Sequence, residues 1–223
     1  MNELDLEAAP AAPLAEILRP KTLDDVVGQA PLLGPQGRLR LMLAHGSLGS
    51  IIFWGPPGTG KTTIARLLAD AADMAFEPIS AVFDGVGELR KVFDRAAQRR
   101  LQGRRTLLFV DEVHRFNKAQ QDGLLPRVED GTVTLVGATT ENPSFALNGA
   151  LLSRAQVLVL DRLDRAALEA ILSRLEVHIG RDLPIDDDAR AALLGMADGD
   201  GRYLLNMASL LVEMPATTRL DSR

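Results

Sequence analysis

The stretch from Gly55 to Thr63 has the residue types and spacing of a loop that binds the phosphates of a nucleoside triphosphate. Its glycines would let the backbone turn tightly, so that successive N–H groups point into one concavity. The Lys61 ammonium would reach the β- and γ-phosphates, and the Thr62 hydroxyl would ligate Mg²⁺. The residues predicted to contact the nucleotide here are Gly55, Pro56, Pro57, Gly58, Thr59, Gly60, Lys61, Thr62 and Thr63.

Two adjacent carboxylates, Asp111 and Glu112, follow the apolar run Thr106–Val110 further along the chain. A buried strand that ends in two acids places both at the carboxyl edge of the sheet, where ligands bind in open α/β folds. Asp111 would hold the Mg²⁺ ion, and Glu112 would orient and polarise the attacking water. An isolated run of this kind is usually a strand entering a turn, but its occurrence together with the phosphate loop favours the catalytic interpretation.

Hydroxyl groups end the next predicted strand, at Thr139 and Thr140. This strand would lie beside the one that bears Asp111, so Thr140 could bind the water or the γ-phosphate. Asn142 is a weaker candidate for the same role. The simpler alternative is that threonine stands at a strand end because of its β-propensity.

Two arginines later in the chain could stabilise charge on the phosphates. Arg154, on a predicted short helix before the last strand, could project from one subunit into a neighbour's γ-phosphate. Arg202 opens the last predicted helix and could fold back onto the phosphates of its own chain. Spacing alone favours a surface role for Arg154 and leaves the role of Arg202 open.

Other polar residues have plainer interpretations. The basic residues Arg90, Lys91, Arg95, Arg99, Arg100, Arg104 and Arg105 could touch a nucleic-acid backbone. No aromatic side chains interleave with them to stack bases, which favours a solvated helix face. His114 has no second histidine at metal-ligand spacing, so a structural or signalling position is expected rather than a metal site.

Alternating strands and helices must position these residues. The strand Ile51–Trp54 leads into the loop, and a helix from Thr62 would point its positive end at the phosphates. Further strands are predicted over 76–80, 106–110, 132–137 and 156–160, with helices over 87–103 and 117–128. This alternation indicates an α/β fold with a parallel sheet between helices.

Beyond residue 160 only helical patterns remain, which predicts a small all-helical lid domain. Asp164 is a helix N-cap there, with Leu163 and Leu168 placed as a hydrophobic staple. Further helices are expected to start at Asp186–Asp188 and at Arg202, the latter ending before Pro215. The predicted organisation is a disordered lead-in over 1–13, a nucleotide-binding domain over 14–160 and a lid over 161–223.

The composition is that of an ordinary globular protein, with 46% apolar and 25% charged residues. The 223 residues contain no cysteine, which excludes disulfides and thiolate metal sites. A net charge of −5 argues against a broad nucleic-acid-binding surface. We find neither a secretion signal nor an apolar run of membrane-spanning length, so a cytoplasmic, nucleoid-associated location is expected.

Taken in order, these motifs resemble the phosphate loop, Walker B, sensor 1, arginine finger and sensor 2 of the AAA+ ATPases. They are Gly55–Thr63, Phe109–Glu112, Ala138–Thr140, Leu152–Arg154 and Gly201–Arg202. The resemblance implies a P-loop αβα sandwich followed by a helical lid, with ATP and Mg²⁺ as cofactors. It also implies functional roles for Thr140, Arg154 and Arg202.

Three further segments are similar to the clamp-loader clade of that family. Leu18–Gln29 looks like the segment that cradles adenine, which implies nucleotide contacts for Pro20, Val27 and Gly28. Asp111–Asp122 and Gly137–Phe145 resemble the replication-associated recombination protein A family.

Membership of that family would imply a DNA-dependent ATPase that acts at stalled forks, gaps and DNA ends. It would form homotetramers and cooperate with single-strand DNA-binding protein. Members of the family are considerably longer, and their oligomerisation region follows the lid, so this chain looks like an ATPase core without it. The alternatives are a clamp-loader subunit, a RuvB-like branch-migration motor, or an ATP-gated scaffold on DNA with incidental turnover.

Overall fold

The computed structural model describes residues 12–214. The lead-in predicted for residues 1–13 therefore falls almost entirely outside the described residues, as does Pro215 with the rest of the C-terminal end.

Five parallel strands form one sheet, as the alternating pattern predicted. They are β1 (Ile51–Trp54), β2 (Ala75–Ser80), β3 (Thr106–Asp111), β4 (Thr134–Thr139) and β5 (Gln156–Val159). Their order in space is β2-β3-β4-β1-β5, so β4 separates the strand that precedes the phosphate loop from the strand that carries Asp111. The prediction that β4 lies beside β3 is confirmed.

β4 begins at Thr134, two residues later than the sequence suggested. The preceding residues complete a turn instead, because the Thr132 N–H donates to the Asp130 carboxylate at 2.7 Å and the Val133 N–H to the Arg127 carbonyl at 3.0 Å. Local hydrogen bonds to an Asp side chain thus compete with the start of the ladder.

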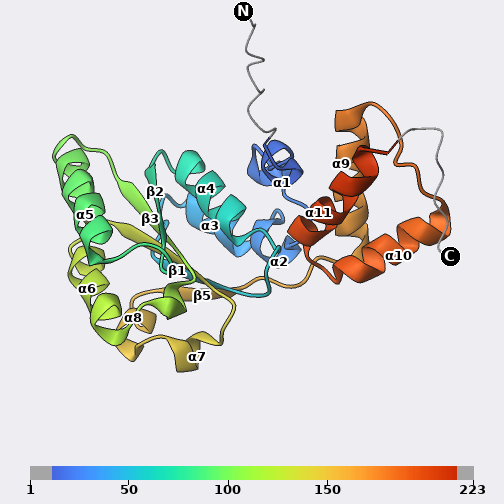
Figure 1. Cartoon of the computed structure of the whole chain (residues 1–223). Coiled ribbons are helices and arrows are strands. Elements are labelled where there is room, and N and C mark those ends of the chain that lie inside the picture. The colour runs from blue at the N-terminus through green and yellow to red at the C-terminus, as the bar shows by residue number, and fades with distance from the viewer. Residues whose placement is uncertain (1–11, 215–223) are drawn as a thin grey trace, which may run out of the picture.

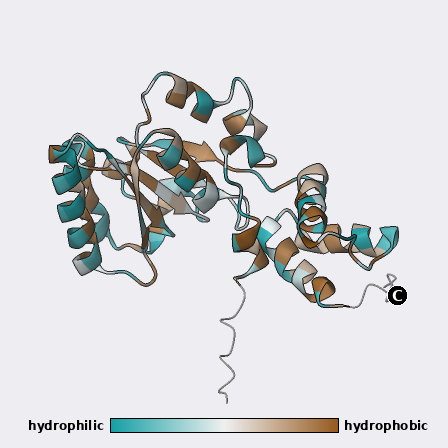
Figure 2. Ribbon diagram, turned by 90° about the horizontal axis from the view of Figure 1, so that it is seen from above, coloured by the Kyte–Doolittle hydropathy of each residue, from teal (hydrophilic) through white to brown (hydrophobic). Residues whose placement is uncertain are grey.

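Helices cover both faces of the sheet (Figure 1). On one face lie α3 (Arg38–Ala44) and α4 (Lys61–Ala71), and on the other α5 (Val86–Leu101), α6 (Lys118–Glu129) and α8 (Gly149–Leu152), which follows the short α7 (Pro143–Ala146). Along β3, Leu107 and Phe109 join the first core while Leu108 and Val110 join the second. In Figure 2 the strands are mostly brown between helices with teal outer faces, as expected for a sheet buried on both sides.

Short elements precede the sheet, namely α1 (Leu14–Ile17), the 3₁₀ turn η1 (Leu23–Asp25) and α2 (Ala30–Leu33). None of them was predicted, because segments of three or four residues are too brief to show a helical period. The Gln29 side chain ties this segment to the chain after β5: its amide donates to the Asp161 carbonyl at 2.7 Å and accepts from the Asp161 N–H at 3.2 Å.

Three helices follow the sheet: α9 (Arg165–Ile179), α10 (Asp187–Ala197) and α11 (Gly201–Val212). Each begins at an aspartate N-cap, and the predicted cap at Asp164 is confirmed by its hydrogen bond from the Ala167 N–H at 2.7 Å. They share a core of their own that also takes in Leu18, so α1 packs against this helical bundle rather than on the sheet. Across residues 12–214, none of the helices is long and apolar enough to cross a membrane.

Candidate nucleotide-binding site

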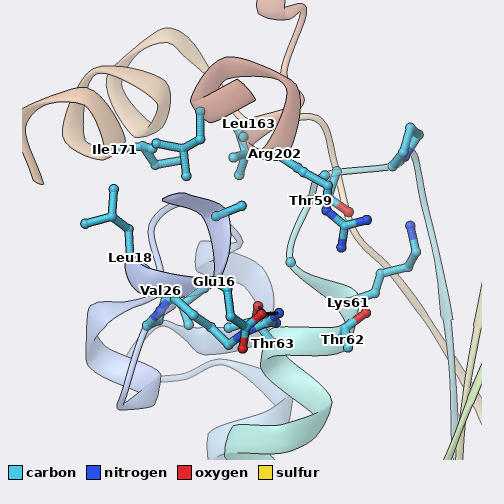
Figure 3. Close-up of a pocket in the computed structure, with 18 of the residues that line it drawn as sticks. Glu16, Leu18, Val26, Thr59, Lys61, Thr62, Thr63, Leu163, Ile171 and Arg202 are labelled. Atoms are coloured by element: carbon cyan, nitrogen blue, oxygen red, sulfur yellow. Dashed lines mark hydrogen bonds and ion pairs between the residues drawn. The ribbon is translucent and has the colours of Figure 1, made fainter. Parts of the chain in front are cut away.

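A cavity of about 470 Å³ lies where the phosphate loop, the N-terminal segment and the three C-terminal helices meet (Figure 3). It brings together most of the residues predicted from the sequence. Those that line it are Pro20, Val27, Pro57, Gly58, Thr59, Gly60, Lys61, Thr62, Thr63, Asp111, Glu112 and Arg202. Segments from three distant parts of the chain therefore form one site.

The loop between β1 and α4 depends on its glycines. Gly58 and Gly60 have φ angles of +67° and +99°, a region that favours glycine over residues with a Cβ. A Cβ on Gly58 would also lie 1.7 Å from the Asp200 carboxylate oxygen. The close approach of the C-terminal helices to the loop therefore requires glycine at this position.

Lys61 is the first residue of α4, and its side chain folds over the loop. The Nζ donates to the carbonyls of Gly55 at 2.8 Å and Pro56 at 2.7 Å, and only 8% of the residue is exposed. Burial lowers the pKa of this ammonium below its usual value, while attraction from Glu112 and Asp111 opposes that shift. The loop thus holds a cation beside the N-terminus of a helix, an arrangement suited to anions.

Asp111 ends β3, and Glu112 follows it in a left-handed conformation with φ +52°. Both side chains reach the cavity although β4 intervenes between their strand and β1. The end of β4 bridges the gap, because the Gly55 N–H donates to the Thr139 carbonyl at 3.2 Å and the Thr140 hydroxyl lies 3.5 Å from Glu112 Oε2. Thr140 itself lines a smaller adjoining pocket with Gly55 and Pro56.

The other end of the cavity is apolar and was largely missed by sequence reasoning. Its side chains come from the N-terminal segment and the C-terminal helices, as Figure 3 shows for several of them. They are Leu18, Val26, Val27, Leu163, Ile171 and Leu205. Gly28 is absent from this lining, but its φ of +71° shapes the turn after Val27, and a Cβ there would meet Leu163 at 3.0 Å. A surface of this kind fits one face of a planar base.

Three charged residues at the cavity were also missed: Glu16, Arg19 and Arg174. Arg19 donates to the Thr63 hydroxyl at 3.0 Å and forms an ion pair with Glu16. The hydrogen bond from Arg19 to the Glu16 carboxylate lowers the pKa of that carboxyl. Arg174 on α9 donates to the Asp25 carbonyl at 2.6 Å. Of these three residues, only Arg19 lies in a segment that the sequence linked to the nucleotide, because Leu18–Gln29 resembles an adenine-cradling motif.

The two arginines proposed to stabilise phosphate charge lie in different places. Arg202 reaches the cavity from α11, whose first N–H, on Gly201, donates to the Gly58 carbonyl at 3.2 Å. In Figure 3 its side chain points toward the loop near Thr59. Arg154 is not among the residues that line the cavity: it lies just after α8, pairs with Glu129 and is 38% exposed.

The basic residues of α5 are partly occupied by ion pairs. Arg95 and Arg99 both bind Glu77 on β2, at distances down to 2.7 and 2.6 Å respectively. These guanidinium groups lower the pKa of the Glu77 carboxyl, and the hydrogen bond from Arg95 makes the largest contribution. Part of this basic stretch therefore stabilises the edge of the sheet.

Comparisons with known proteins agree with this geometry. A model of the ATPase family associated with various cellular activities (AAA) matches residues 51–179. The replication-associated recombination protein A of Escherichia coli K12 is 47% identical over 95% of this chain and 48% of its own length. The protein of the same name from Bacillus subtilis is 36% identical over 90% of this chain and 48% of its own length.

The fold is similar to that of a solved branch migration motor. The Thermotoga maritima RuvB Holliday junction branch migration motor superposes with a TM-score of 0.70 at 28% identity, over 86% of this chain and 64% of that one. The chain spans about half the length of the two curated relatives.

Proposed function

This chain belongs to the AAA family of ATPases, and from that premise we propose that it binds ATP with Mg²⁺ and hydrolyses it as the core of a DNA-dependent replication-fork factor. One observation carries the proposal: a single cavity joins the phosphate loop and the Asp111–Glu112 pair to an apolar surface for the base. A phosphate loop alone would be consistent with many nucleotide-binding proteins. The acidic pair beside it is what hydrolysis requires in addition.

The loop and the N-terminus of α4 would bind the triphosphate, with Lys61 exchanging its present carbonyl partners for phosphate oxygens. Thr62 and Asp111 both line the cavity and offer a hydroxyl and a carboxylate oxygen, a donor set that suits Mg²⁺ shared with phosphates. When bound, the ion would neutralise charge on the β- and γ-phosphates. The Leu18–Gly28 segment and the apolar helix residues would hold the base.

Glu112 would take a proton from the attacking water, and Thr140 would help to orient the carboxylate. Arg202 would report the nucleotide state, because it joins the C-terminal helices to the phosphates. Arg154 would act only on the site of a neighbouring subunit, since its own chain pairs it with Glu129 away from the cavity. Arg154→Ala is therefore expected to leave turnover unchanged in a chain verified as a monomer.

The names of the two relatives support a setting in DNA replication and recombination. We expect action at stalled forks, gaps and DNA ends in the cytoplasm, with single-strand DNA-binding protein as a partner. We also propose homo-oligomers that form through a C-terminal region. The helical lid over 161–223 is proposed as a separate domain. The RuvB likeness supports a branch-migration motor as the second candidate.

Steady-state ATP hydrolysis with and without forked, gapped and four-way junction DNA tests this function. Stimulation by forks and gaps is the expected result, whereas preferential stimulation by four-way junctions would favour the motor. ATP turnover that no DNA changes would support a scaffold with incidental hydrolysis.

A further inference from the structure

His114 lies beside the proposed catalytic glutamate, and the function described above assigns it no task. It belongs to the 3₁₀ turn η2 (Val113–Arg115), and its side chain is only 4% exposed. The ring contacts polar groups on both edges. Nδ1 lies 3.2 Å from Glu112 Oε2 and 2.9 Å from Thr139 Oγ1, while Nε2 lies 3.3 Å from Glu141 Oε1.

The chemistry of these partners defines the direction of the hydrogen bonds. An ionised carboxylate can only accept, so the contact with Glu112 requires a proton on Nδ1. The Thr139 hydroxyl accepts the Glu141 N–H at 3.0 Å and donates to the Glu141 carbonyl at 3.2 Å. Nδ1–H therefore donates its hydrogen bond to Thr139 Oγ1 at 2.9 Å, and the same nitrogen lies in ion-pair contact with Glu112 Oε2 at 3.2 Å.

This arrangement restrains one oxygen of the Glu112 carboxylate. Oε2 contacts Nδ1 of the His114 ring and accepts a hydrogen bond from the Thr140 hydroxyl at 3.5 Å. Within residues 12–214, Oε1 forms no hydrogen bond, and Glu112 lines the nucleotide cavity. Oε2 is thus held by His114 and Thr140, while Oε1 can accept a proton from water.

We propose that His114 is a positioning residue that aims Glu112 at the attacking water through the contact of its Nδ1–H with Oε2, an inference that rests on the proposed function. The tether is rigid because Thr139, the other acceptor of the same N–H, ends β4 and binds the phosphate loop through the Gly55 N–H. A displacement of about 1 Å in a catalytic group can slow a reaction on the order of 100-fold, so such a tether matters for the rate.

Two variants of similar size separate the hydrogen bond from packing. The amide of His114→Asn places an N–H where Nδ1 lies, whereas His114→Leu fills the space without a donor. We expect His114→Leu to lower kcat at least tenfold with ATP affinity within threefold of wild type, and His114→Asn to recover most of the rate. Lys118→Ala, at an exposed position of α6 that is absent from the cavity lining, is the control and should change kcat less than twofold.

A double-mutant comparison shows whether the effect passes through Glu112. In a Glu112→Gln background, His114→Leu should cause no further loss, because the carboxylate to be aimed is gone. Equal losses in both backgrounds would overturn the positioning role, as would wild-type kcat in His114→Leu. If His114→Leu does not fold, His114→Gln replaces it, since its longer amide places the donor near the Nε2 end of the ring, out of reach of Glu112.

The two proposals fail in different ways. Wild-type turnover in Glu112→Gln alone would contradict the proposed function, and the role of His114 with it. Loss of turnover in Glu112→Gln combined with normal turnover in His114→Leu would reject only the positioning role.

Discussion

The two ends of the cavity are assembled differently. The phosphate end is built at the carboxyl edge of one parallel sheet, where β1, β3 and β4 deliver the loop, the acidic pair and Thr140. The apolar end joins the segment around Leu18 and Val27 to helices more than a hundred residues away, and hydrogen bonds connect these parts to the loop. One is the hydrogen bond from the Gly201 N–H to the Gly58 carbonyl. We infer that the sheet edge supplies the chemistry and that the apolar end supplies affinity for the base.

Lys61→Ala should produce the largest loss of binding, because it removes the buried cation of the phosphate end. A hydrogen bond to a charged group contributes about 1.5–3 kcal/mol, so ATP affinity should fall roughly 10- to 100-fold. Titration calorimetry with ATP checks this, with Lys118→Ala as a control, since Lys118 is exposed and absent from the cavity lining. Equal affinities in the two variants would place the phosphates elsewhere.

Ile171→Ala tests the apolar end. Each buried CH₂ contributes about 0.8 kcal/mol, and partial burial against the base predicts a loss of affinity of about fivefold. The loss should be the same for ATP and ADP, because the base end does not contact the γ-phosphate. Val177→Ala on the same helix is the matched control, since that side chain is 82% exposed. A change in the ATP-to-ADP affinity ratio would show that the two ends are not separable in this way.

Glu77→Gln should lower stability without touching the site. The Glu77 carboxylate, 11% exposed, accepts hydrogen bonds from Arg95 and Arg99. Losing these charged hydrogen bonds should lower the free energy of unfolding by about 1–2 kcal/mol at pH 7. The pKa of the Glu77 carboxyl is lower in the folded state than in the unfolded state. The extra stability of the wild type is therefore fully present above the unfolded-state pKa and is lost as the pH falls through the folded-state pKa. Urea unfolding at several pH values measures the stability difference between wild type and Glu77→Gln. A difference that increased at acidic pH would contradict this role of Glu77.

The phosphate end could be predicted from the sequence because its signals are local. Strand, glycine loop and helix follow one another, and Asp111 directly follows a run of buried residues. The apolar end could not, since nothing near Ile171 or Leu205 indicates that these residues line one cavity with the phosphate loop. His114 was judged only by the absence of a second histidine, whereas its partners are an adjacent carboxylate and a hydroxyl brought in by β4.

Arg154 shows a different limit. Its motif predicts a role on phosphates, yet within one chain it binds Glu129 and stays away from the cavity. Neither the sequence pattern nor a single chain contains the neighbour on which the proposed role depends.

Glu112→Gln tests the central claim most directly, because it keeps the shape of the site and removes its proposed base. ATP affinity and single-turnover hydrolysis should be measured on the same sample. Affinity should stay within about twofold, while hydrolysis should fall on the order of 100-fold or more, as expected for loss of general-base catalysis. Hydrolysis at the wild-type rate would contradict the account.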